Sequence, residues 1–412
     1  MTPIPQALAL ADTLAAELSD PRTAWDAAPP GGRAWPQSLA GGAAGIALLH
    51  IERAHCGRGD WDTVHTWLAS AARGDLTAAA NASLYMGAPA LAFAMNAAAG
   101  SSSRRYQRAL KKLDDATITV TRRRLAQAHA RIERGEAPAM KEFDVIRGLA
   151  GLGAYHRTRH PDHPITADVL AYLVRLTETR PQEHALPPWW TDVAPNGEVS
   201  PEYPGGHGNF GMAHGIGSVL ALLSLTLLDG PAAPGTREAV ERICAWTDQW
   251  LRHDATGPWW PGLITPDQAR RHQVAPALRP RPSWCYGIAG TARAQQLAGM
   301  ALGDTARRQT AETAILTTLQ DPTQLDALTD TGLCHGTAGL LQAAWRMATD
   351  ATTGALSAEL PRLTDRLTHQ LTHLADRDPE LLDGITGSAL ALHTLGTNAA
   401  PESGWDTFLL LA

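Results

Sequence analysis

Seven short apolar runs, each opened by small residues, recur along the chain. Each begins at a Gly-x-x-Gly unit or a close variant, as in GAAGIALL from Gly42 and GTAGLLQA from Gly336. Apolar residues then follow three and four apart, which is the period of a helix with one buried face. Amphipathic stretches such as 360–376 lie between the runs, and TITV at 117–120 is the best candidate for an extended segment. The pattern predicts an all-α protein.

The seven units recur at intervals that indicate a repeated structure. Their first glycines are 45, 61, 67, 72, 49 and 48 residues apart, and the shortest intervals fit two helices with two connections. These glycines are Gly42, Gly87, Gly148, Gly215, Gly287, Gly336 and Gly384. Helix pairs that all start alike predict an α/α toroid with seven inner and seven outer helices, as a single domain over residues 1–412. An open solenoid is the alternative. Ala90 and Ser218 replace the second glycine in two units, a change expected to affect packing only.

Three intervals are longer than the others because they hold insertions. The segment 104–136 has ten Lys and Arg against four Asp and Glu, which is a local excess of positive charge. We therefore expect a basic, mainly helical insertion at 101–140, either a solvated arm or a docking surface for an acidic partner. The segments 181–213 and 255–284 are rich in Pro, Gly and Trp, so loops are expected there.

Composition narrows the class of protein further. The chain has 412 residues and a formal net charge of −6, which gives no general case for nucleic-acid binding. Its start lacks the basic residues of a signal peptide, and the longest apolar stretch, 219–228, is too short to span a bilayer. Four cysteines are too few for a disulfide framework. We expect a cytoplasmic protein with no transmembrane segment, in which grouped Cys and His indicate a metal site or catalysis.

Two cysteines occupy equivalent positions before repeat glycines. Cys285 lies in WCYGIAG, and Cys334 lies beside His335 in CHGTAG. In a toroid these turns would collect at one end, in neighbouring repeats. Two thiolates, an imidazole and an open fourth position make the ligand set of a catalytic zinc ion. The alternative is a pair of buried cysteines, since free Cys is commonly buried, but the equivalent placement favours zinc.

Four other polar residues accompany the same turns. His214 directly precedes Gly215, and beside a zinc ion it is a candidate acid or base. Asp144 lies four residues before another repeat glycine, and Arg281 and Tyr286 lie on either side of Cys285. Taken singly, the histidine could be a core residue or a helix cap, and the aspartate an ordinary exposed carboxylate. Taken together, these residues are expected to complete a polar ring at the mouth of the toroid.

These turns resemble those of the lanthionine synthetase C family, the cyclases of lanthipeptide biosynthesis and their relatives. The shared features are WCYG, CHGTAG and AHGIG, and the glycine units extend the resemblance from about residue 35 to the end. The resemblance implies an α/α toroid that binds Zn²⁺. The residues implied are Cys285, Cys334 and His335 as metal ligands, and His214, Asp144, Arg281 and Tyr286 as catalytic residues.

The resemblance also implies a reaction and its partners. A dehydrated precursor peptide would be the substrate, and a lanthipeptide dehydratase is an expected partner. A peptide cysteine thiol would add to dehydroalanine or dehydrobutyrine, which closes a lanthionine or methyllanthionine ring. Zinc would activate the thiol, and Arg281 or a loop amide would stabilise the enolate. His214 would protonate the α-carbon, and Asp144 would orient or recharge that histidine or help to deprotonate the thiol.

Three other functions remain compatible with these residues. A relative of the family could join glutathione or another thiol to dehydroamino acids in damaged proteins. A zinc prenyltransferase subunit shares a helical toroid and thiol activation, but the adjacent Cys334 and His335 fit it poorly. The third is a non-enzymatic helical-repeat scaffold with structural zinc, and the residue types at His214, Asp144 and Arg281 argue against it.

Overall fold

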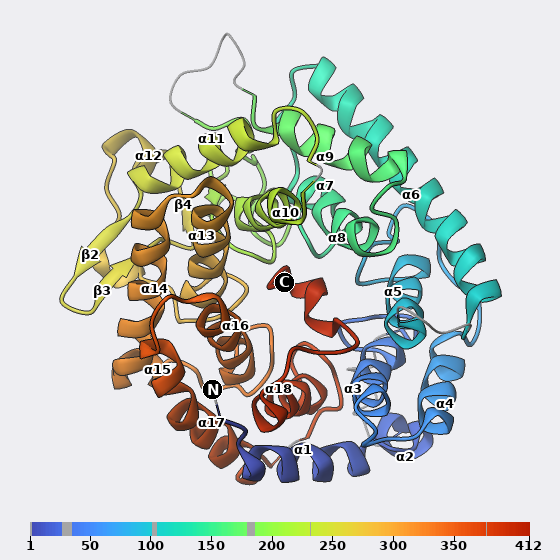
Figure 1. Ribbon diagram of the computed structural model, residues 1–412. Helices are drawn as coiled ribbons and strands as arrows, with labels where there is room; N and C mark the ends of the chain where they lie inside the picture. The colour runs from blue at the N-terminus through green and yellow to red at the C-terminus, as the bar shows by residue number, and fades with distance from the viewer. Residues whose placement is uncertain (1, 27–34, 101–104, 179–185, 231, 376) are drawn as a thin grey trace. The chain divides into compact units, whose positions relative to one another are not determined.

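The computed structural model describes residues 2–26, 35–100, 105–178, 186–230, 232–375 and 377–412 (Figure 1). Over these ranges the chain is mainly helical, with four strands of two or three residues. Its contacts divide it into two compact units, which we call unit 1 (residues 1–120 and 328–407) and unit 2 (residues 121–327 and 408–412). The all-α prediction is confirmed, and the single domain over residues 1–412 stays a prediction.

Four helices of unit 1 begin directly after repeat glycines. They are α3 (Ala43–His55), α5 (Ala88–Ala99), α16 (Thr337–Asp350) and α18 (Ile385–Thr397). A second helix packs on three of them: α4 (Trp61–Ala71) on α3, α17 (Ala355–Thr372) on α16, and α1 (Pro5–Glu17) on α18. The last repeat is therefore paired with the N-terminal helix of the chain. A short helix, α2 (Pro21–Asp26), contacts α4.

Unit 2 repeats the same arrangement three times. Its helices α8 (Leu149–Arg159), α10 (Ile216–Asp229) and α13 (Ile288–Leu302) each follow a repeat glycine. The next long helices along the chain, α9 (Pro164–Leu176), α11 (Thr236–Gln249) and α14 (Thr305–Gln320), pack on them in that order. Helix α10 also contacts α8 and α13, so the three pairs form one continuous core.

The repeat glycines are required by close packing of the backbone. Six of the seven have φ between −101° and −118°, which any residue can adopt, and only Gly87 has a positive φ, of 79°. A Cβ on Gly287 would lie 2.0 Å from the Arg281 carbonyl oxygen, and one on Gly339 would lie 1.9 Å from that of Leu333. A side chain at either position would displace the loop that carries a site cysteine.

The basic insertion contains one long helix, α6 (Gln107–Glu133). The TITV segment lies inside this helix, so the extended structure considered for it was wrong. Its β-branched residues are accommodated because the hydroxyls of Thr117 and Thr119 donate to carbonyls one turn earlier, at 2.7 and 2.8 Å. Residues 101–104 of the insertion lie outside the described residues.

The two Trp-rich insertions contain short paired segments within unit 2. Strand β1 (Gly208–Asn209) pairs antiparallel with β4 (Leu263–Ile264), and β2 (Arg252–Asp254) pairs antiparallel with β3 (Gly257–Trp259). The short helices elsewhere in unit 2 are α7 (Met140–Phe143), α12 (Pro266–Arg271) and α15 (Pro322–Asp326). Single turns of 3-10 helix occur at Pro276–Leu278 and Trp405–Leu409. Residues 181–185 of the predicted loop at 181–213 lie outside the described residues.

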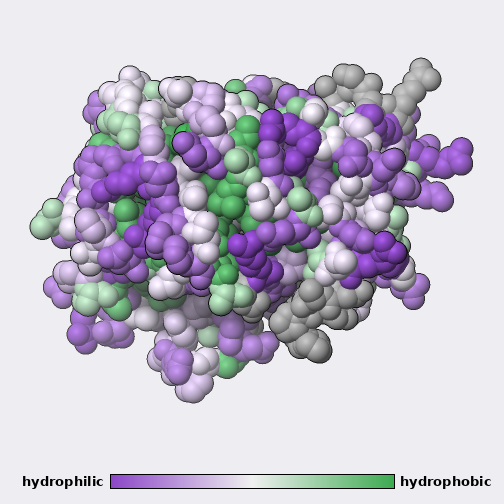
Figure 2. All heavy atoms as spheres, turned by 90° about the horizontal axis from the view of Figure 1, so that it is seen from below, coloured by the Kyte–Doolittle hydropathy of each residue, from purple (hydrophilic) through white to green (hydrophobic). Residues whose placement is uncertain are grey.

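Hydrophilic residues dominate the face of the molecule drawn in Figure 2, with a narrow band of hydrophobic residues near its centre. Among the described helices, none has both the length and the apolar character needed to cross a membrane. The apolar stretch at 219–228 belongs to α10, whose residues 216–226 are buried in the core of unit 2.

Candidate active site

His214 and Asp144 form a hydrogen-bonded pair in unit 2. The Nδ1 atom of His214 lies 2.7 Å from Oδ2 of Asp144. The other carboxylate oxygen, Oδ1, accepts hydrogen bonds from the backbone N–H groups of Arg147 (2.6 Å) and Gly148 (2.8 Å). Asp144 is 1% exposed and the His214 side chain is 22% exposed. The buried carboxylate is fixed on both sides, so it orients an imidazole that solvent and a substrate can reach.

Local structure places both residues at helix starts. Asp144 follows α7 directly and caps the turn that leads into α8. His214 directly precedes Gly215, the N-cap of α10, in a loop where Asn209 Oδ1 accepts the Gly211 N–H at 2.9 Å. A small pocket lined by Met140, Lys141, Asp144, Arg147, Pro195, Gly197, Ala139 and His214 opens beside the pair.

The Cys285 turn packs against the His214 loop. The Cys285 carbonyl accepts the Ala213 N–H at 3.1 Å, and the Tyr286 ring lies 6.2 Å from the His214 ring, centroid to centroid. Cys285 is 7% exposed, and its Sγ is 3.4 Å from Ser283 Oγ. Unit 2 therefore brings Cys285, Tyr286 and His214 together, while Arg281 lies exposed on the same loop as the cysteine.

Cys334 and His335 lie at the start of α16 in unit 1. The Cys334 N–H donates to the Leu382 carbonyl at 2.9 Å, which fixes this turn against the start of α18. Two carboxylates lie beside the imidazole of His335: Asp383 Oδ1 is 3.4 Å from Nδ1, and Asp330 Oδ2 is 3.8 Å from Nε2. Carboxylates in these positions are typical of histidines that bind metals, because they orient the ring and raise its basicity.

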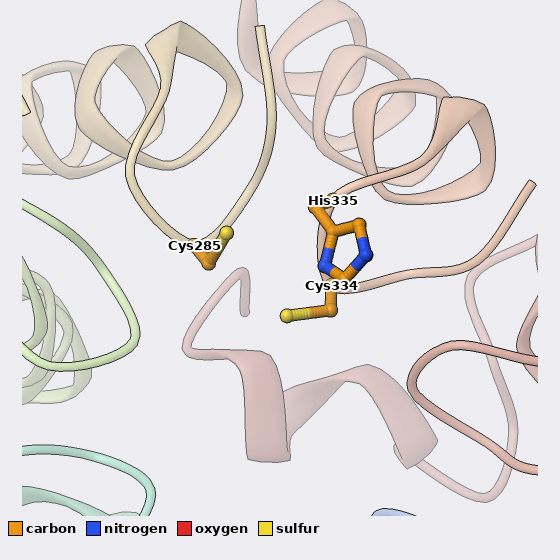
Figure 3. A group of neighbouring side chains, drawn as sticks. All are labelled: Cys285, Cys334 and His335. Atoms are coloured by element: carbon orange, nitrogen blue, oxygen red, sulfur yellow. The ribbon is translucent and has the colours of Figure 1, made fainter. Parts of the chain in front are cut away.

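The three residues that the sequence predicts as metal ligands are Cys285 in unit 2 and Cys334 and His335 in unit 1, and Figure 3 draws their side chains. Two thiolates and one imidazole are a donor set that suits zinc. All four cysteines of the chain are free thiols.

Three residues of this region were not predicted from the sequence. Asp383 had a usable signal, because it directly precedes Gly384 just as His335 precedes Gly336. Asp330 had none. Arg124, on α6, donates to the Arg147 carbonyl in the turn that holds Asp144, and burial lowers the pKa of its guanidinium. Its sequence context, three consecutive arginines, gives no reason to separate it from its exposed neighbours.

Comparisons with known proteins agree with the family and the fold expected from the sequence. A family model described as "Lanthionine synthetase C-like protein" matches residues 33–410. The nisin biosynthesis protein NisC of Lactococcus lactis subsp. lactis is 24% identical over 208 residues, so the alignment spans about half of each protein, 49% of this chain and 48% of the relative. The solved structure of a nisin cyclase superposes with a TM-score of 0.78 at 20% identity, covering 98% of this chain and 97% of that one. The shared fold confirms the predicted fold class, the α/α toroid.

Proposed function

Because the chain belongs to the lanthionine synthetase C-like family, we propose that it is a lanthipeptide cyclase, which closes thioether rings in a dehydrated precursor peptide. In each ring closure a sulfur–carbon bond forms at the β-carbon of dehydroalanine or dehydrobutyrine, and the carbon–carbon double bond becomes single. The proton lost by the thiol is balanced by one gained at the α-carbon. The observation that carries the proposal is the oriented His214–Asp144 pair beside the Cys285 turn.

Zinc is the metal that the donor set supports. Cys285, Cys334 and His335 would hold it, and the carboxylate beside the ring nitrogen that does not bind zinc, Asp383 at Nδ1 or Asp330 at Nε2, would orient the imidazole. When bound, Zn²⁺ would lower the pKa of a substrate thiol and so supply the thiolate nucleophile near neutral pH. The three zinc ligands would determine the position of the peptide sulfur. The Cys285 turn would place that sulfur near the His214 ring.

Proton transfer to the α-carbon is the role we assign to His214. Its Nδ1 is engaged by Asp144, which leaves Nε2 to carry the proton that moves. Asp144 acts as a positioning residue, since its own oxygens are held by the start of α8. Tyr286 packs beside the imidazole, and we assign the exposed Arg281 to the enolate oxygen that develops during attack.

A synthetic peptide that contains one dehydroalanine and one cysteine tests the function. We expect the zinc-loaded enzyme to remove free thiols far faster than the uncatalysed reaction, and to form one stereoisomer of the thioether. Cys334→Ala should contain one zinc ion per chain fewer than the parent protein and lose the acceleration, while keeping its helical circular dichroism. A Cys334→Ala variant with full zinc and full rate would show that the metal assignment is wrong. Faster addition of free glutathione than of the peptide's own thiol would favour the thiol-joining alternative.

Replacing His214 separates proton transfer from metal binding. His214→Asn should retain zinc but cyclise the peptide about 10²–10⁴-fold more slowly, which is the usual contribution of an acid–base group. The assay must follow free thiols and product stereochemistry, because ring closure does not change the mass. His253→Asn, which alters an exposed histidine of the same unit, is the matched control. A variant with the parental rate and stereochemistry would require another proton donor.

The basic helix α6 is the surface we assign to partner docking. Arg122 and Arg123 are exposed on it, whereas Arg124 is partly buried against the Arg147 carbonyl. An acidic leader segment of the precursor, or a lanthipeptide dehydratase in the cytoplasm, would be attracted by the exposed pair. The double reversal Arg122→Glu/Arg123→Glu should weaken precursor binding at low salt and leave turnover of bound peptide unchanged. Equal affinity for both proteins at every salt concentration would exclude this surface.

A further inference from the structure

A second group of metal-binding side chains lies within unit 1. It consists of Glu52 and Cys56 on α3 and His393 on α18, and one ligand atom of each lies within 4.8 Å of the other two. Glu52 and Cys56 are four residues apart, which puts them on one face of their helix. Helices α3 and α18 are in contact and lie side by side in Figure 1.

Glu52 and His393 come together because they lie at similar distances from the starts of α3 and α18. The N–H groups of Leu381 and Leu382 both donate to the Ala40 carbonyl, at 2.9 and 3.0 Å, so the two helices start beside each other. Glu52 is nine residues beyond the start of α3, and His393 is eight residues beyond the start of α18. Eight residues of helix correspond to about 12 Å. The group therefore lies well along α18 from the Cys334 turn, which contacts the start of that helix.

His393 is buried without a hydrogen-bond partner among the residues that the structure describes. It is 1% exposed, and among the described residues neither Nδ1 nor Nε2 has a partner. A buried polar group without a partner costs free energy, so such groups are rare in folded proteins. A ring nitrogen of His393 is one of the three clustered ligand atoms, beside a carboxylate and a thiol. A metal ion bound there would supply the missing partner.

Glu52 is held in place in the way that metal-binding carboxylates are. It is 3% exposed, and its oxygens accept hydrogen bonds from the Glu402 N–H (3.1 Å), the Ser403 N–H (2.9 Å) and the Ser403 hydroxyl (2.6 Å). Cys56 Sγ lies 3.5 Å from Oε1. Within the described part of the chain, no basic side chain forms an ion pair with Glu52. Its charge is thus buried against neutral donors, and a cation would compensate it.

We propose that Glu52, Cys56 and His393 bind a structural Zn²⁺ ion, with water as the fourth ligand. A carboxylate oxygen, a thiolate and an imidazole are all ordinary zinc ligands, and together they select zinc over magnesium or calcium. On binding, the Cys56 thiol proton passes to solvent and a sulfur–zinc bond forms. One thiolate and one carboxylate then neutralise the ion, which limits the cost of burying it. The ion would tie α3 and α18 to the segment at 402–403. This proposal does not depend on the proposed cyclase activity.

Zinc stoichiometry tests the site in a full-length background that lacks the other cysteine ligands. The variant Cys285→Ser/Cys334→Ser, loaded with zinc and then dialysed, should retain about one zinc per chain. Adding Cys56→Ser should remove it. Adding Cys244→Ser instead should not, because Cys244 is a buried thiol of α11 outside both groups. Circular dichroism checks that each variant is folded. Cobalt loading gives a second readout, since thiolate-to-cobalt absorption should require Cys56.

Ser403→Ala provides a milder test that leaves all three ligands in place. Removing the hydroxyl that orients Glu52 should weaken zinc affinity about 10–100-fold, as loss of such supporting hydrogen bonds usually does. Either of two results would overturn the site: no zinc in the Cys285→Ser/Cys334→Ser background, or equal zinc with and without Cys56. Both are independent of peptide cyclisation, so failure of the enzymatic proposal would leave this one standing.

Discussion

Four side chains of the candidate site share one position relative to the repeat glycines. His214, Tyr286, His335 and Asp383 each directly precede the glycine that caps a helix. The helix start fixes the backbone there, because the glycine and the next turn pack against the loop. One residue position per repeat is thus held rigidly, and different repeats fill it with an acid–base group, an aromatic ring, a metal-binding imidazole or a carboxylate.

Asp383→Asn tests whether the carboxylate beside His335 supports metal binding. The change keeps the size of the side chain but removes the charge 3.4 Å from Nδ1. Zinc bound through the Cys334 and His335 turn should weaken about 10–100-fold, because the imidazole loses its orienting partner and some basicity. Competition with a chromogenic chelator measures the affinity. Asp365→Asn, on the exposed face of α17, is the control and should leave it unchanged. Equal affinities in the two variants would assign Asp383 a structural role only.

At the scale of elements, the second glycine of each Gly-x-x-Gly motif determines how closely a helix packs against the loop that precedes it. Gly339→Ala would put a Cβ 1.9 Å from the Leu333 carbonyl oxygen, directly before Cys334. The backbone must move, so we expect the free energy of unfolding to fall by about 1–3 kcal/mol and zinc affinity to fall with it. Gly354→Ala, where no heavy atom lies within 4 Å of the new Cβ, should be neutral or stabilising. Urea denaturation of both variants checks this, and equal stabilities would contradict it.

The Gly-x-x-Gly motifs made the helix starts predictable from the sequence. Contacts between side chains that are far apart in the sequence could not be predicted in this way. All seven first glycines cap helices, because close packing leaves a mark in the sequence wherever a Cβ cannot fit. The pairing of α1 with α18 is marked by Gly396, where a Cβ would lie 2.6 Å from Leu8 Cβ, but the sequence does not show which helix that glycine meets. The hydrogen bond between Asp144 and His214 is equally invisible, because it links side chains 70 residues apart. The role of Arg124 depends on its hydrogen bond to the Arg147 carbonyl, which is 23 residues away in the sequence and comes close only in the folded protein.

At the scale of the whole molecule, both units bury histidines that must stay neutral. Burial lowers the pKa of His50, in α3, to about 4, although its Nε2 contacts the Leu18 carbonyl at 2.8 Å. Burial also lowers the pKa of His207, in the loop before β1, to about 4. These side chains are 5% and 0% exposed. Burial of each histidine is tolerated near neutral pH because desolvation of an uncharged ring needs little free energy. Protonation of the buried ring would destabilise the folded state, because desolvation of the charged form needs much more.

Mild acid should therefore destabilise the protein through these histidines, an effect partly offset by Glu380, because burial raises the pKa of its carboxyl to about 7. An unfolded histidine has a pKa near about 6.5, so between pH 6.5 and pH 4 His50 and His207 bind more protons in the unfolded state than in the folded state. The free energy of unfolding then falls as the pH falls through this window, by up to about 1.4 kcal/mol per pH unit for each such histidine. Urea denaturation from pH 7.5 to pH 4.5 measures the slope. His207→Gln should flatten it whatever the variant's stability at pH 7.5, while His253→Asn, at an exposed position, should leave it unchanged. An identical slope in His207→Gln would show that His207 takes up its proton without unfolding.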